Sequence, residues 1–279
     1  MHRRLRPTDL APGDANVAAG DWSALTVKDV RIPTDPDFAH AFMRLWAEFG
    51  ARGEMERREV IAGRLAWDPT RLVGPTALLY ELLVLRLGTD VVAIRDHTAV
   101  VQREQLDRAR PAVVHLSHAL VEPAYRGSGL AGWLRALPLE AARRCARAAG
   151  CGGSPIILAA EMEHPDPADD ACMTRLRSYE RAGFRKIDPA AAPYSQPDFR
   201  SPELLAGTRP VPVPLSLIVR RVGAEQETRM PAAEVAAVVE SIYAVYAVHV
   251  EAVALDPLRA AAAVWTARSA SFRLVPPTA

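Results

Sequence analysis

Apolar residues recur every three or four positions along TDPDFAHAFMRLWAEFG, at Phe38, Phe42, Leu45, Trp46 and Phe49. Thr34 or Asp35 can cap the start of this segment, and Gly50 follows its end. The spacing places the apolar side chains on one face, so it predicts an amphipathic helix between these caps. A second, shorter helix is expected around Val60, Ile61 and Leu65.

Longer apolar runs follow, and they indicate buried strands. ALLYELLVLRLG and VVAIRDHTAVV are separated only by Gly88, Thr89 and Asp90, which is the arrangement of an antiparallel hairpin. AVVHLSHALVEP is rich in β-branched and apolar residues and ends at Pro123, so it predicts a third strand.

The next part of the chain alternates helix and strand patterns up to about residue 222. The apolar spacing from Gly129 to Ala149 is helical, and Pro138 inside it predicts a kink because proline removes a backbone hydrogen bond. PIILAAEME, FRKID and PLSLIVRRV are typical of strands, and RLRSYERAG of a helix. A strand, helix, strand crossover lays 112–122 and 155–163 parallel, while the other strands add antiparallel neighbours. We therefore expect an α/β fold with a mixed, mostly antiparallel central sheet.

The pattern changes after Val222, where VAAVVESIYAVYAVHV and PLRAAAAVWTARSASF predict alanine-rich helices. We expect a helical C-terminal extension over 223–279 that packs on the domain or on a second subunit, in which case these helices could form a homodimer. Residues 1–20 carry no such pattern and are expected to be a mobile N-terminal lead-in. The main domain is thus expected over 21–222.

The net charge and the spacing of the cysteines indicate which partners and which compartment to expect. Lys and Arg number 34 against 33 Asp and Glu, so the net charge of +1 gives no reason to expect a nucleic acid as partner. Cys145, Cys151 and Cys172 lack the spacing of a zinc site and indicate thiols in a reducing compartment. The longest apolar stretch, near 231–250, is interrupted by glutamates, and no apolar run follows the basic N-terminus as in a secretory signal. These features favour a cytoplasmic protein that does not contact a membrane.

The stretch VEPAYRGSGLAG, residues 121–132, joins a strand to a helix through glycines. Free backbone N–H groups and the positive end of the helix dipole suit a pyrophosphate there. Gly127, Gly129 and Gly132 have the spacing of a dinucleotide fingerprint, but no acidic residue lies about 20 positions further on to bind a ribose hydroxyl. No Gly-Lys-Ser/Thr follows either, which excludes a nucleoside triphosphate loop.

The same stretch resembles the pyrophosphate loop of the GNAT superfamily of acyl-CoA-dependent N-acyltransferases. That loop reads Arg or Gln, x, x, Gly, x, Gly or Ala, and it is matched by Arg126, Gly129 and Ala131 after a Val-x-Pro lead-in. The second signature of the family is a Tyr separated by three residues from Gly-Phe, which SYERAGFRKID matches with Tyr179. The resemblance extends in element order over about 22–222.

The resemblance implies a GNAT-like fold with a parallel, splayed pair of strands, and acetyl-CoA or another acyl-CoA as co-substrate, with no metal. It implies that backbone N–H groups hold the CoA pyrophosphate in the loop Arg126, Gly127, Ser128, Gly129, Leu130 and Ala131. The pantetheine arm would pair with the strand edge at Leu120 and Val121, and Tyr179 would return a proton to the departing thiolate.

The acceptor side departs from the family pattern. Many relatives carry an Asn soon after the second parallel strand, whereas this chain has EMEH, residues 161–164, and then the acidic insertion PDPADDACMT. Glu161 is the candidate general base. An offset of three on a strand sends His115 and His118 to opposite faces, so they cannot chelate together, though one could face the cleft. The acidic insertion matches no known metal loop and is expected to be a solvated loop, which would favour a cationic acceptor if it has a function.

The resemblance implies an N-acetyltransferase that transfers an acetyl group from acetyl-CoA to a primary amine of a small molecule or peptide. Direct attack in a ternary complex is expected, since no cysteine is placed for a covalent relay. The alternatives are a catalytically silent CoA-binding sensor or assembly module and, third, an NAD-dependent oxidoreductase. The proline-rich connection PYSQPDFRSPELLAGTRPVPVP either borders the acceptor site or is a plain surface loop.

Overall fold

The computed structural model describes residues 2–3, 6–16, 21–50, 53–102, 111–199, 208 and 210–279. The strands in these ranges are β1 (His2–Arg3), β2 (Leu25–Val30), β3 (Thr76–Leu87), β4 (Asp90–Gln102), β5 (Ala112–Val121), β6 (Ile156–Met162), β7 (Arg185–Ile187), β8 (Tyr194–Gln196), β9 (Val213–Arg221), β10 (Arg229–Pro231) and β11 (Ser271–Val275). The helices are α1 (Pro12–Ala15), α2 (Pro36–Phe49), α3 (Arg58–Arg64), α4 (Leu130–Ala136), α5 (Pro138–Ala148), α6 (Asp170–Arg181), α8 (Ala232–Tyr246) and α9 (Ala252–Ala267), with 3-10 helices η1 (Pro7–Asp9) and η3 (Pro123–Tyr125). None of the helices described has the length and apolar character needed to cross a membrane.

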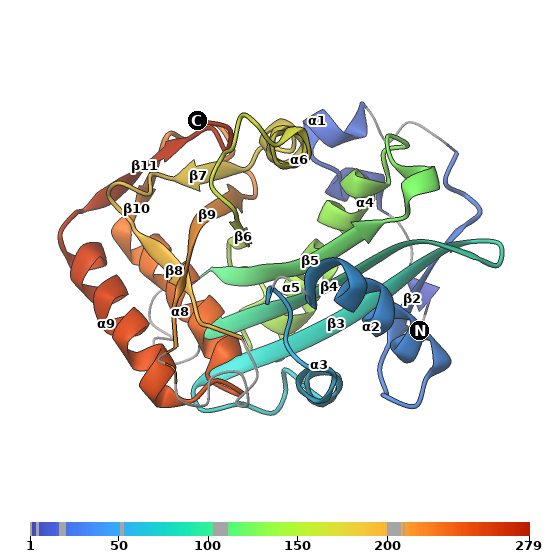
Figure 1. Cartoon of the computed structure of the whole chain (residues 1–279), viewed down its shortest axis with the longest axis horizontal. Helices are drawn as coiled ribbons and strands as arrows, with labels where there is room; N and C mark the ends of the chain where they lie inside the picture. Colours follow the sequence, from blue (N-terminus) through green and yellow to red (C-terminus); the bar gives the residue numbers. More distant parts are fainter. Residues whose placement is uncertain are drawn as a thin grey trace.

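The strands form one mixed sheet in the order β1, β2, β3, β4, β5, β6, β9, β7, β11, β10, and β8 pairs with β9 beside it. The pairing of β5 with β6 is parallel, and the other strand pairings are antiparallel. The expected α/β fold, with a mixed, mostly antiparallel central sheet and one parallel pair, is confirmed (Figure 1).

The parallel pair separates after a few residues, as expected for a splayed pair. Backbone pairing joins Ala112–His115 to Ile156–Ala159, although β5 runs on to Val121 and β6 to Met162. The carboxyl half of β5 therefore has a free edge on the side of β6. Figure 1 shows the two strand ends diverging.

A β-bulge interrupts the pairing of β4 with β5 beside this opening. Between the pairs Asp96–His118 and Thr98–His115, one residue of β4 lies opposite two residues of β5. The extra residue shifts the alternation of side chains by one, so His115 and His118 both face the pocket described below. The prediction that they lie on opposite faces is wrong for this reason.

The helix and hairpin predicted in the first hundred residues are confirmed. The β3–β4 hairpin turns at Gly88, whose φ of 59° is a left-handed conformation that glycine adopts without steric cost. At the start of α2, the side chain of Asp35 accepts a hydrogen bond from the N–H of Asp37 at 3.0 Å. The apolar face of α2 is buried against β3 through Phe38, Phe42 and Leu45.

Helices cover both faces of the sheet. α5 packs on one face through Ala141, Ala142 and Cys145. α8 covers the other face, where Val238 and Ile242 join core residues of β3, β4 and β5, and α9 packs against α8 (Figure 1). The apolar surface of α8 is thus buried within its own chain.

The C-terminal extension also continues the sheet. The expected helices are α8 and α9, but residues 271–275, the first of which were predicted to continue the second helix, form β11. β11 pairs antiparallel with β7, with Leu274 opposite Ile187. In SFRLV the buried residues Phe272 and Leu274 alternate with more exposed ones, and this period of two is that of a strand.

Residues 6–16 pack on α4 and α5, which corrects the prediction of a mobile lead-in for these residues. Asp14 is fully buried and binds Arg135 of α4 through two hydrogen bonds of 2.6 and 2.9 Å. Asp9 binds Arg143 of α5 in the same way at 2.8 and 2.9 Å. Such bidentate pairs fix both position and orientation. Residues 1, 4–5 and 17–20 of the predicted lead-in lie outside the described residues.

The helical segment after the glycine stretch is divided as predicted. α4 ends at Ala136 and α5 begins at Pro138, with Leu137 as the residue shared by the two helix ends. Proline has no backbone N–H to continue the ladder of hydrogen bonds, so the break falls at this position.

Candidate active site

A pocket of about 140 Å³ lies where β5 and β6 separate. Its walls come from β5 and β6, from the segment after α2, from the residues next to β8 and β9, and from α6 and α8. The proline-rich connection borders this pocket through Gln196 and Phe199, whereas 200–207 and residue 209 lie outside the described part of the chain.

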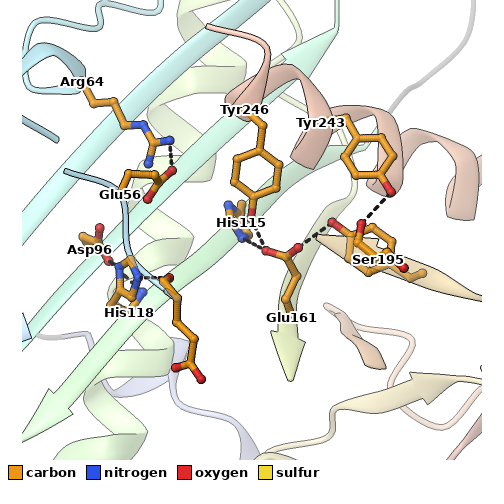
Figure 2. Close-up of polar contacts among 11 residues, drawn as sticks. Glu56, Arg64, Asp96, His115, His118, Glu161, Ser195, Tyr243 and Tyr246 are labelled. Atoms are coloured by element: carbon orange, nitrogen blue, oxygen red, sulfur yellow. Dashed lines mark hydrogen bonds and ion pairs between the residues drawn. The ribbon is translucent and has the colours of Figure 1, made fainter. Parts of the chain in front are cut away.

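Glu161 of β6 is the centre of a hydrogen-bond cluster at the pocket wall (Figure 2). Its Oε1 accepts from the hydroxyl of Tyr194 at 2.6 Å. Its Oε2 accepts from the hydroxyl of Tyr246 and lies 2.9 Å from Nε2 of His115. With the Glu161 side chain only 7% exposed, these partners replace the water that would otherwise solvate the carboxylate.

The two tyrosines remain protonated in this cluster. Burial raises the pKa of Tyr194 and of Tyr246 well above the ordinary value, and the negative charge of Glu161 raises the pKa of both further. A protonated phenol donates to a carboxylate, so Glu161 accepts from both rings.

His118 forms a separate ion pair on the same wall. Its Nδ1 lies 2.9 Å from Oδ1 of Asp96, and its Nε2 lies 3.0 Å from the carbonyl oxygen of Glu54. Burial alone would lower the pKa of His118, but the charge of Asp96 and these hydrogen bonds outweigh burial and raise the pKa to about 9. His118 is therefore an imidazolium that donates from both ring nitrogens and has no lone pair with which to act as a base.

A second buried ion pair joins Glu56, which lines the pocket, to Arg64 of α3 (Figure 2). The two side chains are 8% and 1% exposed, respectively. Burial opposes the charge on each group, but their mutual attraction lowers the pKa of Glu56 and raises that of Arg64. The charge of Glu56 is thus matched by Arg64.

Tyr179 of α6 reaches the pocket from the other face of the sheet. Its ring meets that of Phe184 edge-on with 4.9 Å between centroids, and the guanidinium carbon of Arg135 lies 5.4 Å from the centre of the Tyr179 ring. Because Asp14 holds Arg135, the N-terminal segment helps to fix the position of Tyr179.

Arg95 of β4 is a buried cation beside Tyr179. It is 1% exposed, and its guanidinium interacts with the side chain of Tyr179. Burial lowers the pKa of Arg95, and the neighbouring Tyr179 hydroxyl acts in the opposite direction. A cation in this environment favours the appearance of negative charge nearby.

The glycine stretch forms the predicted strand, turn and helix. Gly127 and Gly129 have φ angles of 78° and 91°, and Gly129 caps α4. Among the hydrogen bonds described, the backbone N–H groups of residue 127 and of 129–131 donate to no protein acceptor. Gly132 serves packing, since a Cβ there would come within 3.0 Å of the Cβ of Asp14. The third glycine of the apparent dinucleotide fingerprint is thus explained without a nucleotide.

Leu120 and Val121 lie between the pocket and this loop. On β5 the pocket lining extends from His115 to Ala119, so neither residue is part of it. The carbonyl of Val121 accepts a hydrogen bond from Nε of the exposed Arg126 at 3.3 Å. The residues expected to bind the cofactor therefore follow the pocket lining without a gap, first at the end of β5 and then in the loop.

The acidic insertion stabilises the backbone around the start of α6. Asp169 caps this helix by accepting from the N–H groups of Ala171 and Cys172 at 2.8 and 3.0 Å, and Asp166 accepts from the N–H of Ala168 at 2.9 Å. In the part of the chain that the structure describes, no group of three or more His, Cys, Asp and Glu residues could hold a metal ion.

Sequence reasoning did not find Tyr194 and Tyr246, which complete the Glu161 cluster. Tyr246 belongs to a helix that reads as apolar core, and Tyr194 lies in the proline-rich connection. The available signal was that a buried tyrosine hydroxyl requires a partner, but the sequence does not say which one.

No family model matches the chain, and no curated protein matches it either. Several solved structures are similar to it. An acetyltransferase of the GNAT family from Streptococcus pneumoniae is 19% identical, with 71% of this chain and 99% of that chain covered and a TM-score of 0.38. YncA from Salmonella typhimurium, solved with its cofactor acetyl-CoA, is 18% identical, with 73% and 97% covered and a TM-score of 0.38.

A tandem GNAT protein from the clavulanic acid biosynthesis pathway is 19% identical, with 67% of this chain covered and a TM-score of 0.36. The chain spans about half of that protein, 52% of its length. At these identities and TM-scores the similarities carry no argument about activity, so the functional assignment depends on the residues of this chain.

Proposed function

We propose that the protein is an acyl-CoA-dependent N-acyltransferase of the GNAT type that transfers an acetyl group from acetyl-CoA to a primary amine. One observation carries the proposal. The parallel strands β5 and β6 separate at a pocket that is lined by Tyr179 from one face of the sheet and by Glu161 from the other. From this pocket, β5 leads into the glycine loop.

The loop would hold the CoA pyrophosphate. This assignment is supported by backbone N–H groups at residue 127 and at 129–131, which donate to no acceptor among the described residues. These groups lie at the N-terminal, positive end of the α4 dipole. The free edge of β5 at Leu120 and Val121 would pair with the amide groups of the pantetheine arm, as one strand pairs with another. This path would deliver the thioester to the pocket.

The chemistry would be a direct transfer. The amine nitrogen attacks the thioester carbonyl, a C–N bond forms as the C–S bond breaks, and the CoA thiolate leaves. Tyr179 would give its hydroxyl proton to the thiolate sulfur, and the buried charge of Arg95 would stabilise the negative charge that develops there. The proton released by the amine would pass to the Glu161 cluster.

The acceptor would be a small molecule. The pocket volume of about 140 Å³ suits the amine end of a small substrate, and Phe49, Phe199 and Tyr246 give it an aromatic lining. Aromatic faces beside the Glu161 carboxylate favour an alkylammonium group over an anionic acceptor.

The competing functions make different predictions. A CoA-binding module without catalysis would keep the loop but would not need the Glu161 cluster. An NAD-dependent oxidoreductase would need the nucleotide fingerprint, whose third glycine serves packing here.

A homodimer through the C-terminal helices stays a prediction, although the buried face of α8 is already covered by its own chain. A cytoplasmic location also stays a prediction.

The test is thiol release from acetyl-CoA in the presence of n-butylamine, benzylamine and short lysine peptides. We expect the amines to stimulate release, and we expect Tyr179→Phe to lower kcat by about 10- to 100-fold while the Kd of acetyl-CoA stays within about twofold. Retention of full turnover by Tyr179→Phe would remove this residue from the mechanism. Acetyl-CoA binding without turnover on any amine would favour the silent module.

A further inference from the structure

The two ring nitrogens of His115 have different environments. Nε2 lies 2.9 Å from Oε2 of Glu161 (Figure 2). Nδ1 is buried and has no hydrogen-bond partner within the described residues. The side chain is 4% exposed, so bulk water does not solvate this nitrogen freely. An unpaired buried acceptor or donor is costly, and its presence beside a pocket calls for an explanation.

Glu161 decides which nitrogen carries the proton. Its two oxygens already accept from the hydroxyls of Tyr194 and Tyr246, and Oε2 presents a further lone pair to His115. The nitrogen that faces it must therefore be the donor, and Nε2 carries the hydrogen. In the neutral ring this leaves Nδ1 with its lone pair and without a donor.

The bulge and the C-terminal extension hold this ring at the pocket. The bulge in β5 brings His115 onto the pocket wall together with His118. The ring of Tyr246 from α8 packs edge-on against that of His115, with 5.6 Å between centroids and an angle of 86°. His118 is already an imidazolium, so of the two histidines only His115 has a nitrogen that can accept a proton.

We propose that Nδ1 of His115 is the proton acceptor for the attacking amine, and that Glu161 is a positioning residue that fixes the tautomer and orientation of His115. Tyr194 and Tyr246 in turn hold Glu161. As the C–N bond forms, one N–H proton of the amine moves to Nδ1, while the thiolate released by cleavage of the C–S bond takes the hydroxyl proton of Tyr179. This inference rests on the proposed acyltransferase function and replaces the expectation that Glu161 itself is the base.

With His115 as the base, the C-terminal extension has a role in the site. Tyr246 belongs to α8, outside the region that the GNAT motifs cover, yet it contacts both members of the His115–Glu161 pair. The extension would therefore be a part of the acceptor side and not an appendage of the domain.

The first experiment compares His115→Ala with the wild type in thiol release from acetyl-CoA with n-butylamine or benzylamine. General base catalysis contributes about 10²- to 10⁴-fold, so we expect kcat to fall by at least about 100-fold, with the Kd of acetyl-CoA within about twofold of the wild type. Added imidazole should restore about tenfold or more of the activity, since it can occupy the space left by the side chain.

Glu161→Gln and Glu227→Gln form a matched pair. Both neutralise one glutamate, but Glu227 is exposed, pairs with Arg221 and lies outside the pocket lining. We expect a loss of about tenfold or more in kcat for Glu161→Gln and a change of less than about threefold for Glu227→Gln. Equal effects of the two variants would contradict a positioning role.

A measurement of the ring nitrogens needs no acceptor. In ¹⁵N NMR spectra of the wild type, His115 should have a protonated Nε2 and an unprotonated Nδ1, and this tautomer should be lost in Glu161→Gln. A protonated Nδ1 in the neutral wild-type ring would overturn the proposal. So would wild-type rates in His115→Ala, or a loss that imidazole does not restore. An absence of turnover in the wild type with every amine is a different result, because it would contradict the acyltransferase function itself.

Discussion

His115 and His118 differ by three positions in the sequence, yet their neighbours give them opposite properties. Both nitrogens of His118 have acceptors, the carboxylate of Asp96 and the carbonyl of Glu54, so the charged ring is held in place. Within the described ranges, His115 has one acceptor, and its Nδ1 has no hydrogen-bond partner. The chemistry of each ring follows from the number of its acceptors, which a sequence alone does not give.

The charge of His118 predicts how stability depends on pH. Its folded-state pKa of about 9 lies above the ordinary value of 6.5, so its contribution is complete below about pH 6.5 and is lost as pH rises through about 9. A shift of this size corresponds to about 3 kcal/mol. The groups that face the ring are Asp96, Glu56 and the carbonyl of Glu54.

We therefore expect the free energy of unfolding, measured with guanidinium chloride between pH 6 and 9.5, to fall more steeply with pH in the wild type than in His118→Asn. The two proteins should differ most at the acid end of this range. Parallel curves would mean that His118 is not charged in the folded protein.

At the level of single residues, the sequence offers candidates that lie in short contiguous segments. Glu161 and Tyr179 line one pocket, and the loop from Arg126 to Ala131 has the expected turn and helix start. Tyr194 and Tyr246 could not be found in this way, because they meet Glu161 across 33 and 85 positions of the chain. The bulge in β5 was equally hidden, since it is an irregularity of pairing between two strands.

Among the elements, the N-terminal segment has the clearest unexpected role. It contributes Asp14 to a buried ion pair with Arg135, and Arg135 in turn packs on the ring of Tyr179. Short polar segments with little apolar periodicity look mobile in a sequence. What holds this one is two bidentate pairs with α4 and α5, and their partners lie more than a hundred positions away.

Asp14→Asn tests this role. The substitution leaves Arg135 buried, at 4% exposure, without its carboxylate, so we expect a loss of about 3 kcal/mol in the free energy of unfolding. Asp256→Asn on α9 is the control, because Asp256 is exposed and its nearest cation is 3.8 Å away. Denaturant unfolding of both variants gives the comparison, and equal stabilities would show that the segment is not held through Asp14.

For the whole molecule, the apolar runs predicted the mixed sheet and its parallel pair, because strand order follows from where crossovers and hairpins fall. The same apolar runs did not reveal β10 and β11, which are short strands on either side of the two C-terminal helices. Consequently the C-terminal extension appeared to be purely helical, whereas it continues the sheet beyond β7 and brings Tyr246 to the pocket.

In the proposed function, the glycine loop and the opened strand pair bind acyl-CoA. The most direct test is calorimetric titration of the protein with acetyl-CoA, CoA and NAD, using Arg126→Glu and, as its matched control, Arg126→Gln. Arg126 is exposed, so both variants should fold. We predict saturable binding of acetyl-CoA and CoA, weakened about tenfold or more by Arg126→Glu, little changed by Arg126→Gln, and no binding of NAD. If the folded protein binds neither CoA species, or binds NAD instead, the glycine loop is not an acyl-CoA site.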